Sequence, residues 1–246
     1  MLETAPTNAP RRGSRFGILL EHIVTGTLLV ALAVALRHAL PLSELFAWKV
    51  MTAVFVGGAV TLSLSIKHLP TSTLGAANHV TLARAGLVAV LIGFIGESQL
   101  GWTAFSVAAA VLVLDGVDGW VARRLEIASD FGARFDMETD ALSLVAIAGL
   151  VWQHGKAGPW VLLAGLMRYA FVAATKAMPY LAGPLPPSLR RKAAFVIVAM
   201  TLIGCLAPIV NPPLSAGLAL AGVLTLTASF AIDIAHLARA AGQTSP

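Results

Sequence analysis

The sequence has little charge and few of the residues that build metal sites from sulfur or imidazole. Charged residues make up 12% of its 246 residues, about half the fraction of an ordinary soluble domain. The single cysteine, Cys205, excludes an intrachain disulfide and a cysteine metal cluster. The six histidines are scattered and form no ligand pattern. These absences argue against a soluble domain and against a zinc or disulfide scaffold.

What the chain has in abundance is apolar sequence. Hydrophobic residues make up 57% of it, and its mean hydropathy is +0.82. Only helices and closed barrels satisfy their backbone in lipid, and the long apolar runs lack the alternating period of barrel strands. Since a spanning helix needs about 20 apolar residues, we expect an all-α, polytopic membrane bundle of about eight spans. The expected spans are residues 16–40, 46–66, 78–98, 101–122, 137–154, 158–178, 193–210 and 213–238.

The distribution of basic residues predicts the orientation of this bundle. The net charge is +5, and most Lys and Arg residues fall on one side when the N-terminus is placed inside. The exceptions are Arg37, Lys49, Lys156 and Arg168. The positive-inside rule therefore predicts that both termini are cytosolic. Because topology explains the charge, we expect no nucleic-acid partner.

The acidic residues are concentrated in one segment. Seven of the twelve lie between Asp115 and Asp140. Asp115 and Asp118 are three residues apart and Asp136 and Asp140 four apart, so each pair shares a helix face. Carboxylates next to hydrocarbon require compensating positive charge. The segment therefore predicts a polar site where two spans meet at the cytosolic face.

The residue types in this segment favour a divalent metal site. Oxygen ligands suit Mg²⁺ or Mn²⁺, and the segment contains no histidine or cysteine. Two such ions can clamp a pyrophosphate. Arg123 would add a fixed cation, and one carboxylate could serve as a general base. The other acids of the segment are expected to be structural or solvated: Glu126, Asp130 and Glu138.

The same residues resemble the signature of the CDP-alcohol phosphatidyltransferases. The matching pattern is Asp115-x2-Asp118-Gly119-x2-Ala122-Arg123-x8-Gly132-x3-Asp136-x3-Asp140. The segment 78–84, N-H-V-T-L-A-R, is similar to the start of that family's first core helix. The resemblance covers about residues 70–240 and implies a six-helix catalytic core.

The resemblance implies a role for each matching position. Asp115, Asp118 and Asp136 would be the principal ligands of two Mg²⁺ or Mn²⁺ ions, and Asp140 would complete the site and act as the base. Arg84 resembles a position near the nucleotide or at the mouth of the site. The positions expected to bind the nucleotide are Asp118, Gly119, Ala122, Arg123, Gly132, Asn78 and Thr81.

The resemblance also implies a domain organisation. A basic cytosolic tail (1–15) and two additional spans (16–66) precede the catalytic membrane domain (67–240), and a short tail (241–246) ends the chain. The additional spans are structural or oligomeric, with a role in regulation or substrate access as the alternative. The expected location is a bacterial inner membrane, with the site on the cytosolic side, and the family resemblance implies a homodimer.

Four basic residues are candidates for an acceptor phosphate: Arg168, Arg190, Arg191 and Lys192. Arg168 lies in the middle of a span, where an arginine needs a polar partner. Its alternative role is structural pairing with an aspartate or with backbone carbonyls. The cluster at 190–192 could also be a positive-inside anchor that contacts lipid headgroups.

The resemblance implies transfer of a phosphatidyl group from CDP-diacylglycerol to a polar alcohol, with release of CMP. The basic set favours a phosphorylated acceptor such as glycerol 3-phosphate. Inositol phosphate, inositol and serine are the alternatives within the same chemistry. From a different class, the alternative is a cation transporter that uses intramembrane carboxylates.

Overall fold

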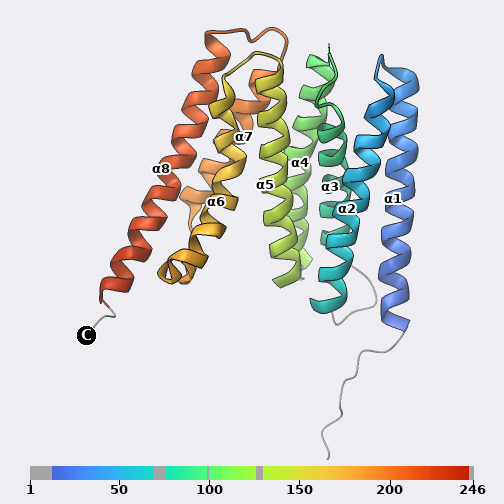
Figure 1. The fold of residues 1–246 in the computed structure, drawn as a ribbon. Coiled ribbons are helices and arrows are strands. Elements are labelled where there is room, and N and C mark those ends of the chain that lie inside the picture. The colour runs from blue at the N-terminus through green and yellow to red at the C-terminus, as the bar shows by residue number, and fades with distance from the viewer. Residues whose placement is uncertain (1–12, 69–75, 99, 126–129, 244–246) are drawn as a thin grey trace, which may run out of the picture.

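The computed structural model describes residues 13–68, 76–98, 100–125 and 130–243, and all regular structure in this part of the chain is helical (Figure 1). The 3₁₀ turn η1 (Pro159–Leu162) precedes α6, and η2 (Pro179–Ala182) follows it. The α-helices are α1 (Gly13–Ala39), α2 (Glu44–His68), α3 (Ala76–Gly93), α4 (Gly101–Leu125), α5 (Asp130–Gln153), α6 (Leu163–Ala177), α7 (Leu189–Leu206) and α8 (Leu214–Gln243).

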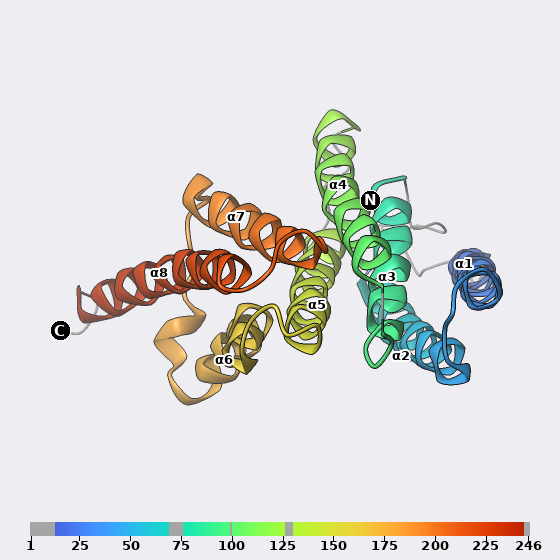
Figure 2. The ribbon, with the colours of Figure 1, turned by 90° about the horizontal axis from the view of Figure 1, so that it is seen from above.

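The helices share one overall axis, and successive helices point in alternating directions (Figure 1). Viewed from above, α1 and α2 lie at one end of the bundle, α7 and α8 extend to the other, and α3, α4 and α5 lie between them (Figure 2). The most extensively packed pairs are α1 with α2, α3 with α4, and α7 with α8. The helix α3 also packs against α2 and α5. The expected all-α bundle is confirmed.

Four of the described helical segments are long and apolar enough to cross a membrane. They are Gly17–Ala39, Glu44–Ser63, Pro159–Ala177 and Leu214–Gly242. The apolar parts of α3 and α4 are shorter, at Asn78–Gly93 and Gly101–Val117. The helices α5 and α7 carry charged residues in their first turns.

Several expected boundaries differ from the helix bounds by four residues or more, among them the end of the last span, where α8 continues to Gln243. The helix expected at 137–154 begins at Asp130. Its first two turns are helical but polar, so a search for apolar runs places the start too late. The span expected at 78–98 ends at Gly93, and Gly96 follows with a φ of +91° in a turn. The span expected at 193–210 ends at Leu206, because Pro208 disfavours helical backbone in the residue before it.

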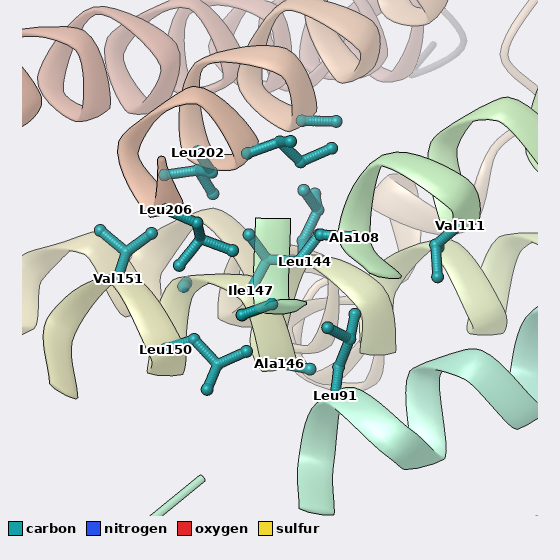
Figure 3. Close-up of a cluster of buried hydrophobic side chains, with 14 of the residues drawn as sticks. Leu91, Ala108, Val111, Leu144, Ala146, Ile147, Leu150, Val151, Leu202 and Leu206 are labelled. Atoms are coloured by element: carbon teal, nitrogen blue, oxygen red, sulfur yellow. The ribbon is translucent and has the colours of Figure 1, made fainter. Parts of the chain in front are cut away.

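Buried apolar side chains from α3, α4, α5 and α7 form the centre of the core (Figure 3). Val111 lies four residues before Asp115 on α4, and Leu144 lies four residues after Asp140 on α5. Asp115 and Asp140 therefore lie on the same helix faces as the core residues, one turn beyond the last of them. Close packing of these apolar neighbours holds the backbone of both helices in place.

Two glycines allow close helix contacts. A Cβ at Gly165 of α6 would lie 2.5 Å from the backbone nitrogen of Val145 on α5. A Cβ at Gly86 of α3 would lie 2.3 Å from the Leu29 side chain of α1. Small residues at such positions are typical of membrane helices that pack closely. The additional hairpin α1–α2 is thus fitted against the same helix that carries Arg84.

The buried carboxylate of Glu97 connects this hairpin to the turn between α3 and α4. It accepts hydrogen bonds from the backbone nitrogen of Ser43 at 2.8 Å and from its hydroxyl at 2.6 Å. The Lys49 ammonium lies 3.0 Å from the same carboxylate. Burial alone would raise the pKa of Glu97, but the Ser43 hydrogen bonds and the Lys49 charge together lower it below the ordinary glutamate value.

We expect Glu97→Gln to lower the free energy of unfolding by about 1–3 kcal/mol at neutral pH, because buried donors lose a charged acceptor. Glu44→Gln is the matched control: the Glu44 side chain is 87% exposed in its pair with Arg37, so its loss should change little. Since the folded-state pKa of Glu97 is depressed, its contribution is complete above the unfolded value of about 4.3. It disappears as the pH falls through the folded value. Thermal unfolding in detergent across this pH range measures both effects, and a Glu97→Gln deficit that persists at the acid end would contradict this assignment.

Candidate functional site

Three carboxylates converge where α4 and α5 face each other. Asp115 comes from α4, and Asp136 and Asp140 lie one turn apart on α5. One carboxylate oxygen from each lies within 4.8 Å of the others. The side chains of Asp115, Asp136 and Asp140 are 24%, 41% and 23% exposed, so they are only partly screened by solvent. This all-oxygen donor set fits a hard divalent cation.

Among the described residues, the guanidinium of Arg84 on α3 pairs with these carboxylates. This side chain is 1% exposed. One terminal nitrogen donates to Asp115 and the other to Asp136, and the second also lies 3.2 Å from Asp140. The planar fork of arginine suits such multiple pairing. The resemblance had put Arg84 near the nucleotide or the mouth, whereas the structure puts it inside the carboxylate cluster.

A small cavity of about 10 Å³ adjoins the cluster between α4, α5 and α7. Asp115, Asp140 and Ser143 contribute its polar atoms, and Phe195 of α7 is among its apolar walls. The Ser143 hydroxyl donates to the backbone carbonyl of Asp140 at 2.7 Å. The volume is on the order of one water molecule. Asp115 and Asp140 thus face the interior between these helices rather than the lipid.

The other expected nucleotide and metal positions are only partly described. Asp118 lies on α4 one turn after Asp115, but its side chain lies outside the described residues, as do those of Ala122 and Arg123. Gly119 and Gly132 are partly buried on α4 and α5. Of the segment resembling the first core helix, Asn78 and Thr81 are 8% and 4% exposed. They precede Arg84 at intervals of three residues and so lie toward the same side of α3.

Two of the basic candidates for the acceptor are paired with acidic side chains. Arg168 donates to Glu138 at 2.5 Å, so this glutamate has a basic partner on α6. Arg190 donates to Asp233 of α8 at 2.5 Å and to the carbonyl and hydroxyl of Ser229 at 2.6 Å.

The remaining two members of the basic set differ from each other. Arg191 donates to the backbone carbonyl of Pro186 and lies 3.7 Å from Asp233. Lys192 is exposed on α7. The sequence analysis missed Asp233 as a partner. Its signal was a lone acid in the apolar α8, opposite the basic start of α7.

We expect Arg84→Gln to destabilise the protein by about 3–5 kcal/mol in the absence of divalent metal, because gathered carboxylates lose their buried cation. Mg²⁺ or Mn²⁺ should then restore more stability in this variant than in the wild type. Arg168→Gln is the control, since its partner Glu138 is a single, 47% exposed carboxylate. Thermal unfolding with and without metal makes the comparison. Equal losses in the two variants, or no metal-dependent recovery in Arg84→Gln, would refute the counter-cation role.

Comparison with known proteins bears on this geometry. A family model described as CDP-alcohol phosphatidyltransferase matches residues 74–245. The match includes α3 to α8 and therefore all three carboxylates and Arg84, while α1 and α2 precede it. No curated protein and no solved structure matches the chain.

Proposed function

The chain belongs to the CDP-alcohol phosphatidyltransferase family, and from this premise we propose that it transfers a phosphatidyl group from CDP-diacylglycerol to a polar alcohol and releases CMP. Family membership makes it a membrane transferase that uses CDP-alcohol substrates. The observation that supports the specific proposal is the convergence of Asp115, Asp136 and Asp140 from two helices of the matched segment. A diphosphate donor needs divalent cations to compensate its negative charge, and these carboxylates would hold such cations.

In this proposal the metal site consists of these three carboxylates together with Asp118. The family generally uses divalent metals, and the donor set fits two Mg²⁺ or Mn²⁺ ions. Such ions supply positive charge to the diphosphate and stabilise the attacking and leaving oxygens. The pairing of Arg84 with all three carboxylates also supports the proposal, because it shows that a cation binds between them.

The chain's own residues then perform binding and proton transfer. Asp140 is the proposed base. It takes the proton from the acceptor hydroxyl while the oxygen of that hydroxyl forms a bond to the phosphatidyl phosphorus. The bond from that phosphorus to the oxygen of CMP breaks, and CMP leaves. The proposed nucleotide positions are Asp118, Gly119, Ala122, Arg123, Gly132, Asn78 and Thr81.

The proposed acceptor is phosphorylated, with glycerol 3-phosphate as the first choice. Arg168 on α6 and the basic start of α7 (Arg190, Arg191 and Lys192) supply the charge for its phosphate. In the structure, Arg168 is paired with Glu138 and Arg190 with Asp233. An acceptor phosphate would therefore exchange with a carboxylate rather than enter an empty basic pocket.

The proposed location is a bacterial inner membrane, with the site toward the cytosol and the protein as a homodimer. The start of α1, the start of α5 and the end of α8 lie toward the same end of the bundle (Figure 1). This arrangement supports cytosolic termini next to the metal site.

We expect Asp136→Asn to abolish CMP release from CDP-diacylglycerol without preventing membrane insertion, because one metal-binding carboxylate is lost. Glu44→Gln, which changes an exposed acid outside the family-matched segment, should retain wild-type turnover. CMP release by purified protein in mixed micelles measures both. Full activity in Asp136→Asn would disprove the site assignment.

Asp140→Asn should behave differently from Asp136→Asn if Asp140 is mainly a base. We expect it to retain CDP binding better than turnover, since the amide cannot accept the proton. CDP titration in the presence of Mn²⁺ and single-turnover CMP release separate the two properties. Equal loss of both would show that Asp140 acts mainly as a ligand.

The acceptor can be identified by incubating the protein with CDP-diacylglycerol and glycerol 3-phosphate, inositol phosphate, inositol or serine. We expect lipid product with glycerol 3-phosphate. Arg168→Gln should raise the KM for this acceptor by about 10- to 100-fold, the effect of losing a charged hydrogen bond. Mass spectrometry of the extracted lipid decides between the acceptors. Product only with an unphosphorylated alcohol would reject the phosphate assignment.

A further inference from the structure

A second cavity, of about 320 Å³, lies between α1, α2, α3 and α5. Its volume lies at the lower end of the range of ligand pockets. Two of its four walls, α1 and α2, precede the family-matched segment. The other two are the helices that carry Arg84 and Asp136. The cavity therefore lies between the additional hairpin and the catalytic helices, and the metal-binding role of the carboxylates does not account for it.

The lining is polar at one end only. His22, Thr61 and Glu138 lie about 10–14 Å along their helices from the ends that lie toward the cytosol in the proposed orientation, at 1.5 Å per residue. Leu29, Val54 and Ile92 line the other end, about 10 Å deeper. The cavity thus runs from the polar side of the bundle toward the middle of the membrane.

The polar atoms at the shallow end are used within the protein. His22 has its Nδ1 2.8 Å from the carbonyl of Ile18 and its Nε2 3.1 Å from the Thr61 hydroxyl. That hydroxyl donates to the carbonyl of Gly57. Glu138 is paired with Arg168. What the cavity presents to an occupant is therefore apolar surface, which suits an alkyl chain and disfavours a sugar or nucleotide.

The wall formed by α2 is thin and faces lipid. Val56 and Val60 line the cavity and are 55% and 52% exposed. Gly57 and Gly58 line it too, and a Cβ built on either meets nothing within 4 Å. Leu142 of α5, which is 44% exposed, is a further lining residue. In a bilayer the medium next to these residues is hydrocarbon, so acyl chains have direct access.

We propose that this cavity binds an acyl chain of a resident phospholipid from the cytosolic leaflet. The acyl chain fills the space between the additional hairpin and the catalytic helices, and the phospholipid's headgroup stays near the polar end of the cavity. An empty apolar space forfeits dispersion contacts that an alkyl chain restores. The occupant braces α3 and α5 against α1 and α2. The cavity borders the proposed acceptor site through Glu138, the partner of Arg168, but lipid binding in it does not depend on the proposed reaction.

The first test uses the wild-type full chain in detergent, so that no variant has to fold. After delipidation, we expect a phospholipid with long acyl chains to raise the unfolding temperature. A short-chain phospholipid with the same headgroup, tested below its micelle concentration, should not. Equal shifts would mean that a headgroup is recognised and would overturn the proposal, as would no shift with either lipid.

The second test fills the cavity from within. Gly57→Phe and Gly58→Phe each add a ring at a residue that lines the cavity and has open space around its Cβ, and both should lose the phospholipid that native mass spectrometry finds on the wild type. They should also lose the response to long-chain lipid. Gly217→Phe is the matched control: Gly217 is exposed on α8 and also has open space around its Cβ, so lipid retention should be unchanged.

A second copy of the chain is the competing occupant. If its helix filled the cavity, Gly57→Phe would change the mass of the complex in light scattering and leave lipid retention unchanged. That result would overturn the proposal. Wild-type lipid retention in both glycine variants would do the same.

Discussion

The pairing of one buried arginine with three carboxylates is the interaction on which this structure depends. Asp115, Asp136 and Asp140 come from two successive helices, and their repulsion would push α4 and α5 apart in a medium that screens charge poorly. Arg84 offsets this repulsion from α3. It therefore holds together the three helices that surround the site. The same demand for positive charge makes the cluster suitable for divalent cations and for a diphosphate substrate.

The two ends of the bundle use polar groups differently. At the end opposite the metal site, Glu97 accepts hydrogen bonds from Ser43 and pairs with Lys49. These contacts join the additional hairpin to the turn between α3 and α4. At the other end, three of the described carboxylates pair with the single guanidinium of Arg84, so among these four side chains negative charge is in excess. This asymmetry argues against a cation path through the protein. Among the described residues, the candidate metal-binding group lies at one end only.

The periodicity of the apolar runs and the spacing of the aspartates were enough to predict the helical bundle and the convergence of α4 and α5. The place of Arg84 was harder to predict. Its partners are 31 and 52 residues away along the chain, and only the packing of α3 shows that it reaches both. The start of α5 at Asp130 was missed because hydropathy cannot recognise polar helical turns. The cavity beside α2 depends on the shapes of side chains from four helices, which no sequence pattern encodes.

The central claim is that the Asp115, Asp136 and Asp140 cluster binds a cytidine diphosphate group through divalent cations. It is tested most directly by measuring the unfolding temperature of the purified chain with CDP, with Mn²⁺ and with both. The account predicts a large stabilisation by CDP only when Mn²⁺ is present, and its loss in Asp115→Asn. Stabilisation by CDP that is independent of Mn²⁺, or that is undiminished in Asp115→Asn, would contradict it.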